Sequence, residues 1–272
     1  MKKLFILVTC ALLAGLWISC AGPDAAEVSE LDMLREEYDI IGVAHNEALS
    51  MVFTDLVKER EKKELSYDEC IMIAERCLGS HQVPSLSMII GPGQSNAYEH
   101  YIAPLLASRH VFSKAALSEE IIDVLSDSVD IIEKHKGIFD MIGNILDSST
   151  DVEEKTQQLE QLYLTVDSDI EPGYEKEAIM NSVSTIVHSL AYWEEHLQEW
   201  EEILSSGMQK SAAIGIGGAI AVIDGVGAVI GTLEGFRDTE PGDEGRGWTI
   251  AGRAVGEAAK TSTYAVLAII LL

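Results

Sequence analysis

Two opposite charges, Asp224 and Lys260, lie in the two most apolar stretches of the chain. Asp224 lies within residues 211–235, SAAIGIGGAIAVIDGVGAVIGTLEG, and Lys260 lies within residues 248–272. A polar turn separates the stretches, and counting outward from Gly242 brings Asp224 opposite Lys260. We therefore predict an ion pair between two antiparallel helices, because removing either partner would leave the other charge buried and unpaired.

His45 and Asn46 are adjacent polar residues that together offer the donors and acceptors of a polar site. We favour a hydrogen-bonded core histidine instead, because a lone histidine lacks the base and orienting partners that catalysis requires. The irregular stretch of residues 80–112 is the place where we would expect a ligand pocket, among Tyr98, His100 and Tyr101.

Two motifs that resemble functional loops are incomplete. Residues 91–95, GPGQS, lack the Gly-Lys-Ser/Thr ending of a phosphate-binding loop and the Gly-x-Ser-x-Gly spacing of a hydrolase nucleophile. Residues 167–178 begin with alternating acids like a calcium loop, but Pro172 and Ala178 replace the glycine and glutamate that such a loop needs.

Cys70 and Cys77 lie seven residues apart on one predicted helix, roughly 10 Å along its axis. That separation exceeds the reach of a disulfide, so we expect both to be buried small side chains. A zinc site would need more ligands at short spacing than the sequence offers here. We therefore expect no enzyme activity, no metal and no cofactor.

Cys20 follows a segment typical of an export signal. Lys2 and Lys3 precede an apolar run of residues 4–18, which is too short for a transmembrane helix and ends at the small Ser19. An ordinary signal peptide cut near this point is the alternative to lipidation of Cys20.

The end of this segment, Trp17-Ile18-Ser19-Cys20, resembles the lipobox of bacterial lipoproteins. The resemblance implies that the cysteine becomes the first residue of the mature chain and carries a thioether-linked lipid. Acyl chains such as palmitate would then anchor the protein without a membrane span. Ala21 in place of aspartate implies, by the same resemblance, the outer membrane.

A second segment, residues 38–49, has the pattern YDxIGxxHNxxL and resembles a segment of uncharacterised exported bacterial proteins. It implies a bacterial origin and no known activity.

The composition restricts the class of partner. The formal charge is −26, and losing Lys2 and Lys3 with the signal leaves about −28. Nucleic-acid binding depends on clustered Lys and Arg, so we expect no nucleic-acid partner. Hydrophobic residues make up 47% of the chain, so it is not a disordered acidic tail.

Apolar residues at steps of three and four predict helices throughout residues 31–208. Capping boxes, Ser66–Glu69 and Thr150–Glu153, mark two helix starts, and residues 118–132 form a continuous periodic run. Heptad spacing runs from Ile179 to Leu204 and makes Trp193 and Trp200 core residues. The fold class is therefore all-α, an antiparallel helical bundle followed by a glycine-rich helical hairpin.

The domain organisation is a signal at residues 1–19, a lipidated cysteine and tether at 20–30, the bundle at 31–208 and the hairpin at 209–272. Gly227, Gly231 and Gly235 recur every four residues, which lets a partner backbone approach one face closely. We favour a hairpin buried by the bundle over one inserted in a bilayer, because charges within a membrane are rare.

The first function hypothesis is an envelope lipoprotein with a structural or interaction role, bound to the membrane through its lipid and to a protein partner or to itself. The alternative is a membrane-active protein that inserts its hairpin, which by hydropathy alone resembles pore-forming colicins and the glycine-zipper tails of some outer-membrane lipoproteins. A hydrolase is the weakest hypothesis, although inverting carboxylates could be present among so many acids.

Overall fold

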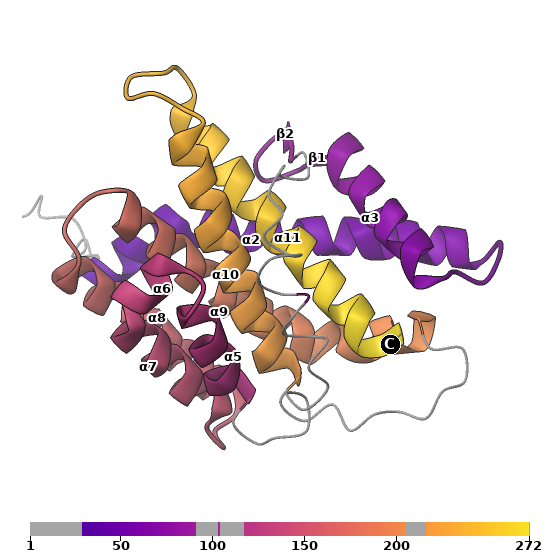
Figure 1. Ribbon diagram of the computed structural model, residues 1–272, viewed down its shortest axis with the longest axis horizontal. Coiled ribbons are helices and arrows are strands. Elements are labelled where there is room, and N and C mark those ends of the chain that lie inside the picture. The colour runs from indigo at the N-terminus through magenta and orange to yellow at the C-terminus, as the bar shows by residue number, and fades with distance from the viewer. Residues whose placement is uncertain (1–28, 91–102, 104–116, 205–215, 272) are drawn as a thin grey trace, which may run out of the picture.

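The structure is a computed structural model that describes residues 29–90, 103, 117–204 and 216–271. Cys20 and the candidate residues Tyr98, His100 and Tyr101 lie outside the described residues. The regular secondary structure of the described chain is helical apart from one short antiparallel pair of strands, β1 (Gln82–Val83) and β2 (Met88–Ile89), in which Gln82 faces Ile89. The all-α prediction is confirmed. The helices, labelled in Figure 1, are α2 (Glu30–Arg60), α3 (Tyr67–Ser80), α5 (Leu117–Ser126), α6 (Asp130–Lys134), α7 (Lys136–Asp147), α8 (Val152–Asp169), α9 (Tyr174–Leu204), α10 (Ile216–Arg237) and α11 (Arg246–Leu271).

Local capping interactions set several helix starts. Ser66 and Glu69 form the predicted capping box of α3, each side chain bonding the backbone N–H of the other. For α8 the predicted cap, Thr150, is wrong by one residue. The Asp151 carboxylate accepts the N–H of Glu154 at 2.9 Å, and an aspartate caps at least as well as a threonine.

The continuous helix predicted over residues 118–132 is broken in the structure. α5 ends at Ser126 and α6 begins at Asp130. The Ser126 hydroxyl donates to the Asp123 carbonyl at 2.8 Å, a local bond by which serine competes with helical pairing. Apolar periodicity continues across the break, which is why the sequence pattern did not reveal it.

Three glycines of α10, Gly227, Gly231 and Gly235, lie against the backbone of α11, as their spacing predicted. A Cβ atom added at Gly231 would lie 2.2 Å from the Arg253 carbonyl oxygen, and one at Gly227 would lie 2.8 Å from the Cα of Ala258. Backbone atoms cannot move aside cheaply, so these positions accept only glycine at this helix separation.

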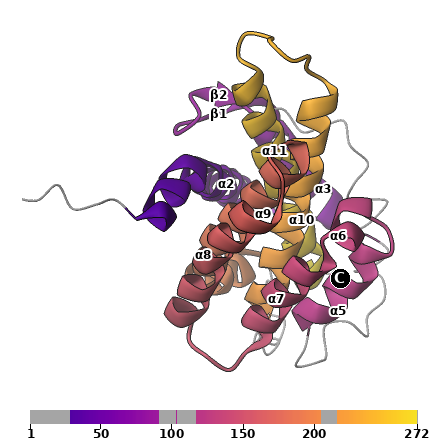
Figure 2. The same ribbon diagram turned by 90° about the vertical axis from the view of Figure 1, so that its left-hand side faces the viewer.

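The hairpin of α10 and α11 completes the hydrophobic core. The described core has two clusters of buried side chains, and both include residues of α9, α10 and α11. Trp193 and Trp200 are fully buried, which confirms their assignment to the core. Figures 1 and 2 show α10 and α11 side by side among the other helices, with their connecting turn extending beyond the rest of the bundle.

Three helices in the described part of the chain, α2, α10 and α11, have the length and apolar composition that a bilayer crossing requires. The most apolar windows of α10 and α11 are each 83% buried within the protein, against 44% for α2. In this structure the two hairpin helices therefore contact protein over most of their apolar surface.

Candidate functional site

Asp224 projects from α10 into a polar network at the centre of the protein and has no exposed surface. Its Oδ2 atom accepts a hydrogen bond from the Ser189 hydroxyl and another, at 3.1 Å, from the indole Nε1 of Trp193. Both donors lie on α9, so the carboxyl group ties the hairpin to one of the two longest described helices.

His45 approaches the same carboxyl group from α2. Its Nε2 lies 3.6 Å from Oδ2 of Asp224, and its Nδ1 lies 3.0 Å from Oδ1 of Asn46. The Asn46 amide nitrogen donates to the carbonyl of His188 at 3.0 Å, so its oxygen must accept from His45. This hydrogen-bond arrangement assigns the imidazole proton to Nδ1 and turns the lone pair of Nε2 towards Asp224.

Burial keeps both titratable groups uncharged. Burial raises the pKa of Asp224 to about 7, against the opposing effect of its hydrogen bonds from Ser189, Ser262 and Trp193. Burial also lowers the pKa of His45 to about 4, although the hydrogen bond to Asn46 opposes the change. Between these values a protonated Asp224 and a neutral His45 coexist, so the 3.6 Å approach is between neutral groups.

Lys260, the predicted partner of Asp224, lies on α11 with 7% of its surface exposed. Its ammonium nitrogen is 5.8 Å from the centre of the Tyr264 ring. The donors to Asp224 are Ser189 and Trp193 on α9 and Ser262 on α11, and its close contact with an imidazole comes from α2. The pairing of Asp224 with Lys260 therefore stays a prediction.

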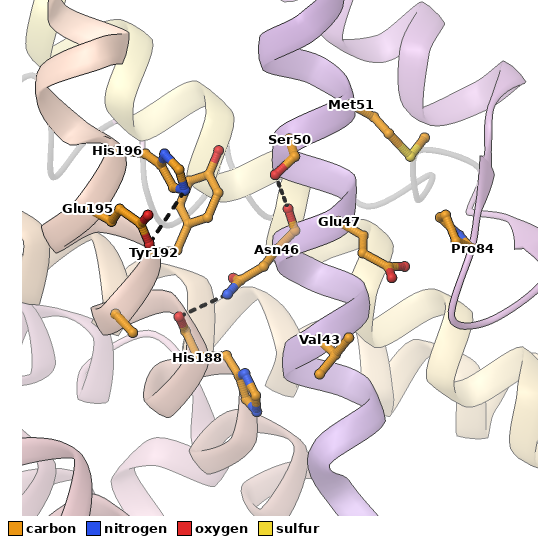
Figure 3. Close-up of a pocket in the computed structure, with 11 residues that line it drawn as sticks. Val43, Asn46, Glu47, Ser50, Met51, Pro84, His188, Tyr192, Glu195 and His196 are labelled. Carbon is orange, nitrogen blue, oxygen red and sulfur yellow. Dashed lines mark hydrogen bonds and ion pairs between the residues drawn. The ribbon is translucent and has the colours of Figure 1, made fainter. Parts of the chain in front are cut away.

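A surface cleft of about 520 Å³ lies between α2 and α9, directly outside this network. Figure 3 shows Asn46 on its wall, with the amide turned towards the backbone of His188. Asn46 thus joins the cleft to the buried His45. Among the residues that the structure describes, the cleft has acidic and imidazole side chains and no Lys or Arg. Its lining residues are Val43, Asn46, Glu47, Ser50, Met51, Pro84, His188, Ala191, Tyr192, Glu195 and His196.

Comparisons with protein-family models, curated proteins and solved structures find no match to this chain. The function of the cleft and network must therefore be argued from their own geometry.

The geometry does not activate either serine at this site. Ser189 gives its proton to Asp224, and Ser50 gives its proton to the Asn46 carbonyl at 2.8 Å. A serine nucleophile needs instead a histidine placed to take the hydroxyl proton. His45 and Asp224 are also sealed from solvent, so a substrate in the cleft cannot touch them.

Sequence reasoning found one half of this site and missed the other. His45 and Asn46 were recognised as a polar pair, and the expectation of a buried, hydrogen-bonded histidine is confirmed. Ser189 was missed, because only folding brings α9 against α2. The available signal was weak: Ser189 and Trp193 are four residues apart, so both face the same neighbour.

Proposed function

We propose that the protein is a bacterial envelope lipoprotein whose helical body is a non-enzymatic interaction module, anchored by acyl chains on Cys20. The observation that supports this proposal is the closure of the polar network. The network joins α2, α9 and α10, and outside it lies an open cleft whose described lining has no Lys or Arg. This arrangement suits a rigid scaffold that presents a binding surface better than it suits a reaction centre.

Anchoring through Cys20 is tested by metabolic labelling with a palmitate analogue. The wild-type protein is expected to take up the label and the Cys20→Ser variant to lose it, while Cys70→Ser retains it. Labelling that persists in Cys20→Ser would overturn the lipoprotein proposal. Separation of inner and outer membranes from the labelled cells tests the expected outer-membrane location.

The interaction role is tested by placing a photo-cross-linking residue at Glu195 in the cleft and, as a matched control, at exposed Met141 on α7. We expect a discrete adduct from position 195, either with another protein or with a second copy of the chain. Adducts at 141 alone would show that the cleft is not the binding surface.

A second candidate function is supported by one specific observation. α10 and α11 are each long and apolar enough to cross a bilayer, and they form one hairpin covered by amphipathic helices. A protein that opens its bundle and inserts this hairpin would be membrane-active. Washing membranes of cells that export the Cys20→Ser variant at alkaline pH separates the two functions. Release into the soluble fraction supports the interaction module, and retention supports insertion.

A further inference from the structure

A mixed cluster of metal-binding side chains lies between α2 and α3, on a different part of α2 from the cleft. Asp55 comes from α2, Cys77 from the last turns of α3, and His81 directly follows α3. One ligand atom from each, a carboxylate oxygen, a sulfur and a ring nitrogen, all lie within 4.8 Å of one another. Cys77 is fully buried, Asp55 is half-buried and His81 is exposed.

The hydrogen bonds of His81 fix which ring nitrogen carries the proton. Nδ1 lies 3.2 Å from the Cys77 carbonyl oxygen and 3.1 Å from the Ser80 hydroxyl oxygen. Ser80 gives its own proton to the Arg76 carbonyl at 2.6 Å, so both neighbours accept from Nδ1. The neutral ring therefore has its lone pair on Nε2. A backbone carbonyl that accepts from the far nitrogen is also the usual support of a metal-bound histidine.

The other two ligands face the same point. Nε2 of His81 lies 4.0 Å from Oδ2 of Asp55, which brings two lone pairs together. The second oxygen of that carboxylate, Oδ1, accepts from Lys58 at 3.3 Å, which leaves Oδ2 for the shared point. The Cys77 thiol donates a hydrogen bond to the Asp55 carboxylate, and burial together with this carboxylate raises the pKa of Cys77 to about 12.

We propose that Asp55, Cys77 and His81 form a Zn²⁺ site that joins α2 to α3. Zn²⁺ accepts sulfur, imidazole and carboxylate ligands in one tetrahedral shell, and bonds of about 2.0–2.3 Å place ligand atoms roughly 3.3–3.8 Å apart. The observed separations, 4.0 Å between His81 and Asp55 and at most 4.8 Å among the three ligand atoms, must shorten by up to about 1 Å, and exposed His81 can move to shorten them. Three protein ligands leave the fourth position to water.

Binding exchanges a proton for the metal. The Cys77 S–H bond breaks, its proton leaves to solvent, and the sulfur electron pair forms the bond to zinc. The metal stays Zn²⁺ throughout, so no oxidant or reductant is involved. A simple ion pair between protonated His81 and Asp55 is the competing explanation of the 4.0 Å approach, and it predicts no affinity for zinc.

Cobalt is a suitable probe, because Co²⁺ adopts the same site and a cobalt–thiolate bond absorbs in the near ultraviolet. The protein is the chain from residue 20 onward with Cys20→Ser, reduced and stripped with a chelator. Removing that thiol leaves Cys70 and Cys77 as the two cysteines of this chain. We expect one Co²⁺ per chain, a thiolate band, and loss of the band when one equivalent of Zn²⁺ is added.

The variants identify the ligands. His81→Gln and Asp55→Asn, which alter residues that are not fully buried, should each weaken Co²⁺ binding at least tenfold, and Cys77→Ser should abolish the band. Cys70→Ser is the matched control, because Cys70 is a buried cysteine on the same helix and should leave the band unchanged. Circular dichroism shows whether each variant is folded.

Two results would overturn the proposal. One is the absence of a thiolate band in folded protein with excess Co²⁺. The other is a band that survives His81→Gln and Asp55→Asn at wild-type affinity. As a second measurement, Zn²⁺ should raise the unfolding temperature of the protein with the intact cluster and leave that of the His81→Gln variant unchanged. The reason is that a ligand which binds only the folded state stabilises that state by mass action.

Discussion

Nε2 of His45 lies 3.6 Å from Oδ2 of Asp224, and neither side chain has any exposed surface. Their titrations act on stability in opposite directions. Asp224 keeps its proton in the folded protein up to about pH 7, so its contribution to stability is lost as the pH rises from about 4 to about 7. His45 stays neutral down to about pH 4, so its contribution is lost as the pH falls from about 6.5 to about 4. The two effects offset each other across this range.

Replacing Asp224 with Asn should reveal the effect of His45 on the pH dependence of stability, because the opposing effect of Asp224 is removed. The amide oxygen can still accept from Ser189 and Trp193, and it carries no charge at any pH. Relative to wild type, the free energy of unfolding of Asp224→Asn should rise between pH 4 and pH 7 by on the order of 2–4 kcal/mol. Urea unfolding at several pH values measures this difference in the free energy of unfolding, with a substitution of the exposed Asp123, Asp123→Asn, as the control. A difference that does not change with pH would contradict the raised pKa of Asp224.

Replacing His45 with Gln should have the opposite pH dependence. The variant removes a group that resists protonation, so its stability relative to wild type should be highest near pH 4 and should decline as the pH rises to about 6.5. The same unfolding series detects this change. His196→Gln, which alters a half-buried histidine of the cleft, should show a much weaker trend, and equal trends in both variants would refute the interpretation.

The predicted pair of Asp224 and Lys260 is tested by exchanging its charges. Asp224→Lys and Lys260→Asp should each destabilise the protein, because the first buries a second ammonium group beside Lys260 and the second buries another carboxyl group beside Asp224. The double variant should recover most of the loss if the residues are partners. Additive losses, measured by chemical unfolding, would show that they do not interact.

The separation of α10 from α11 predicts a difference between two glycines of α10. Gly231→Ala places a methyl group 2.2 Å from a backbone oxygen and should lower the free energy of unfolding by more than about 2 kcal/mol. At Gly217 the nearest atom would be 3.5 Å away, which is an ordinary contact. Gly217→Ala should therefore be neutral or stabilising, since alanine favours helix by about 1 kcal/mol. Equal losses in thermal unfolding would mean that the hairpin is not closely packed.

Periodicity was sufficient to predict the long helices, because each has one apolar stripe that must face the core. The heptad run from Ile179 to Leu204 lies wholly within α9, which begins only five residues earlier, at Tyr174. The break between Ser126 and Asp130 was not predictable in this way, since a break that keeps the apolar residues buried leaves their spacing unchanged.

The candidate sites were harder to predict, because each combines residues from helices distant in sequence. Asp224 was recognisable as a charge in an apolar stretch, but its donors Ser189 and Trp193 lie about 30 residues away. Cys77 lies in the last turn of α3 and His81 directly follows the helix, four residues later, and this spacing is a usable metal signal. The third proposed ligand, Asp55, is on another helix, so short spacing in the sequence does not reveal the cluster.

The position of the hairpin along the chain determines the order in which the protein can fold. Both hydrophobic clusters contain side chains of α10 and α11, which follow all the other described helices along the chain. Until α10 and α11 are synthesised, the apolar faces of α2 and α9 that pack against them stay uncovered. The nascent chain is therefore prone to aggregation. The core therefore cannot close before α10 and α11 are synthesised, and a chaperone that holds the chain until then would protect it from aggregation.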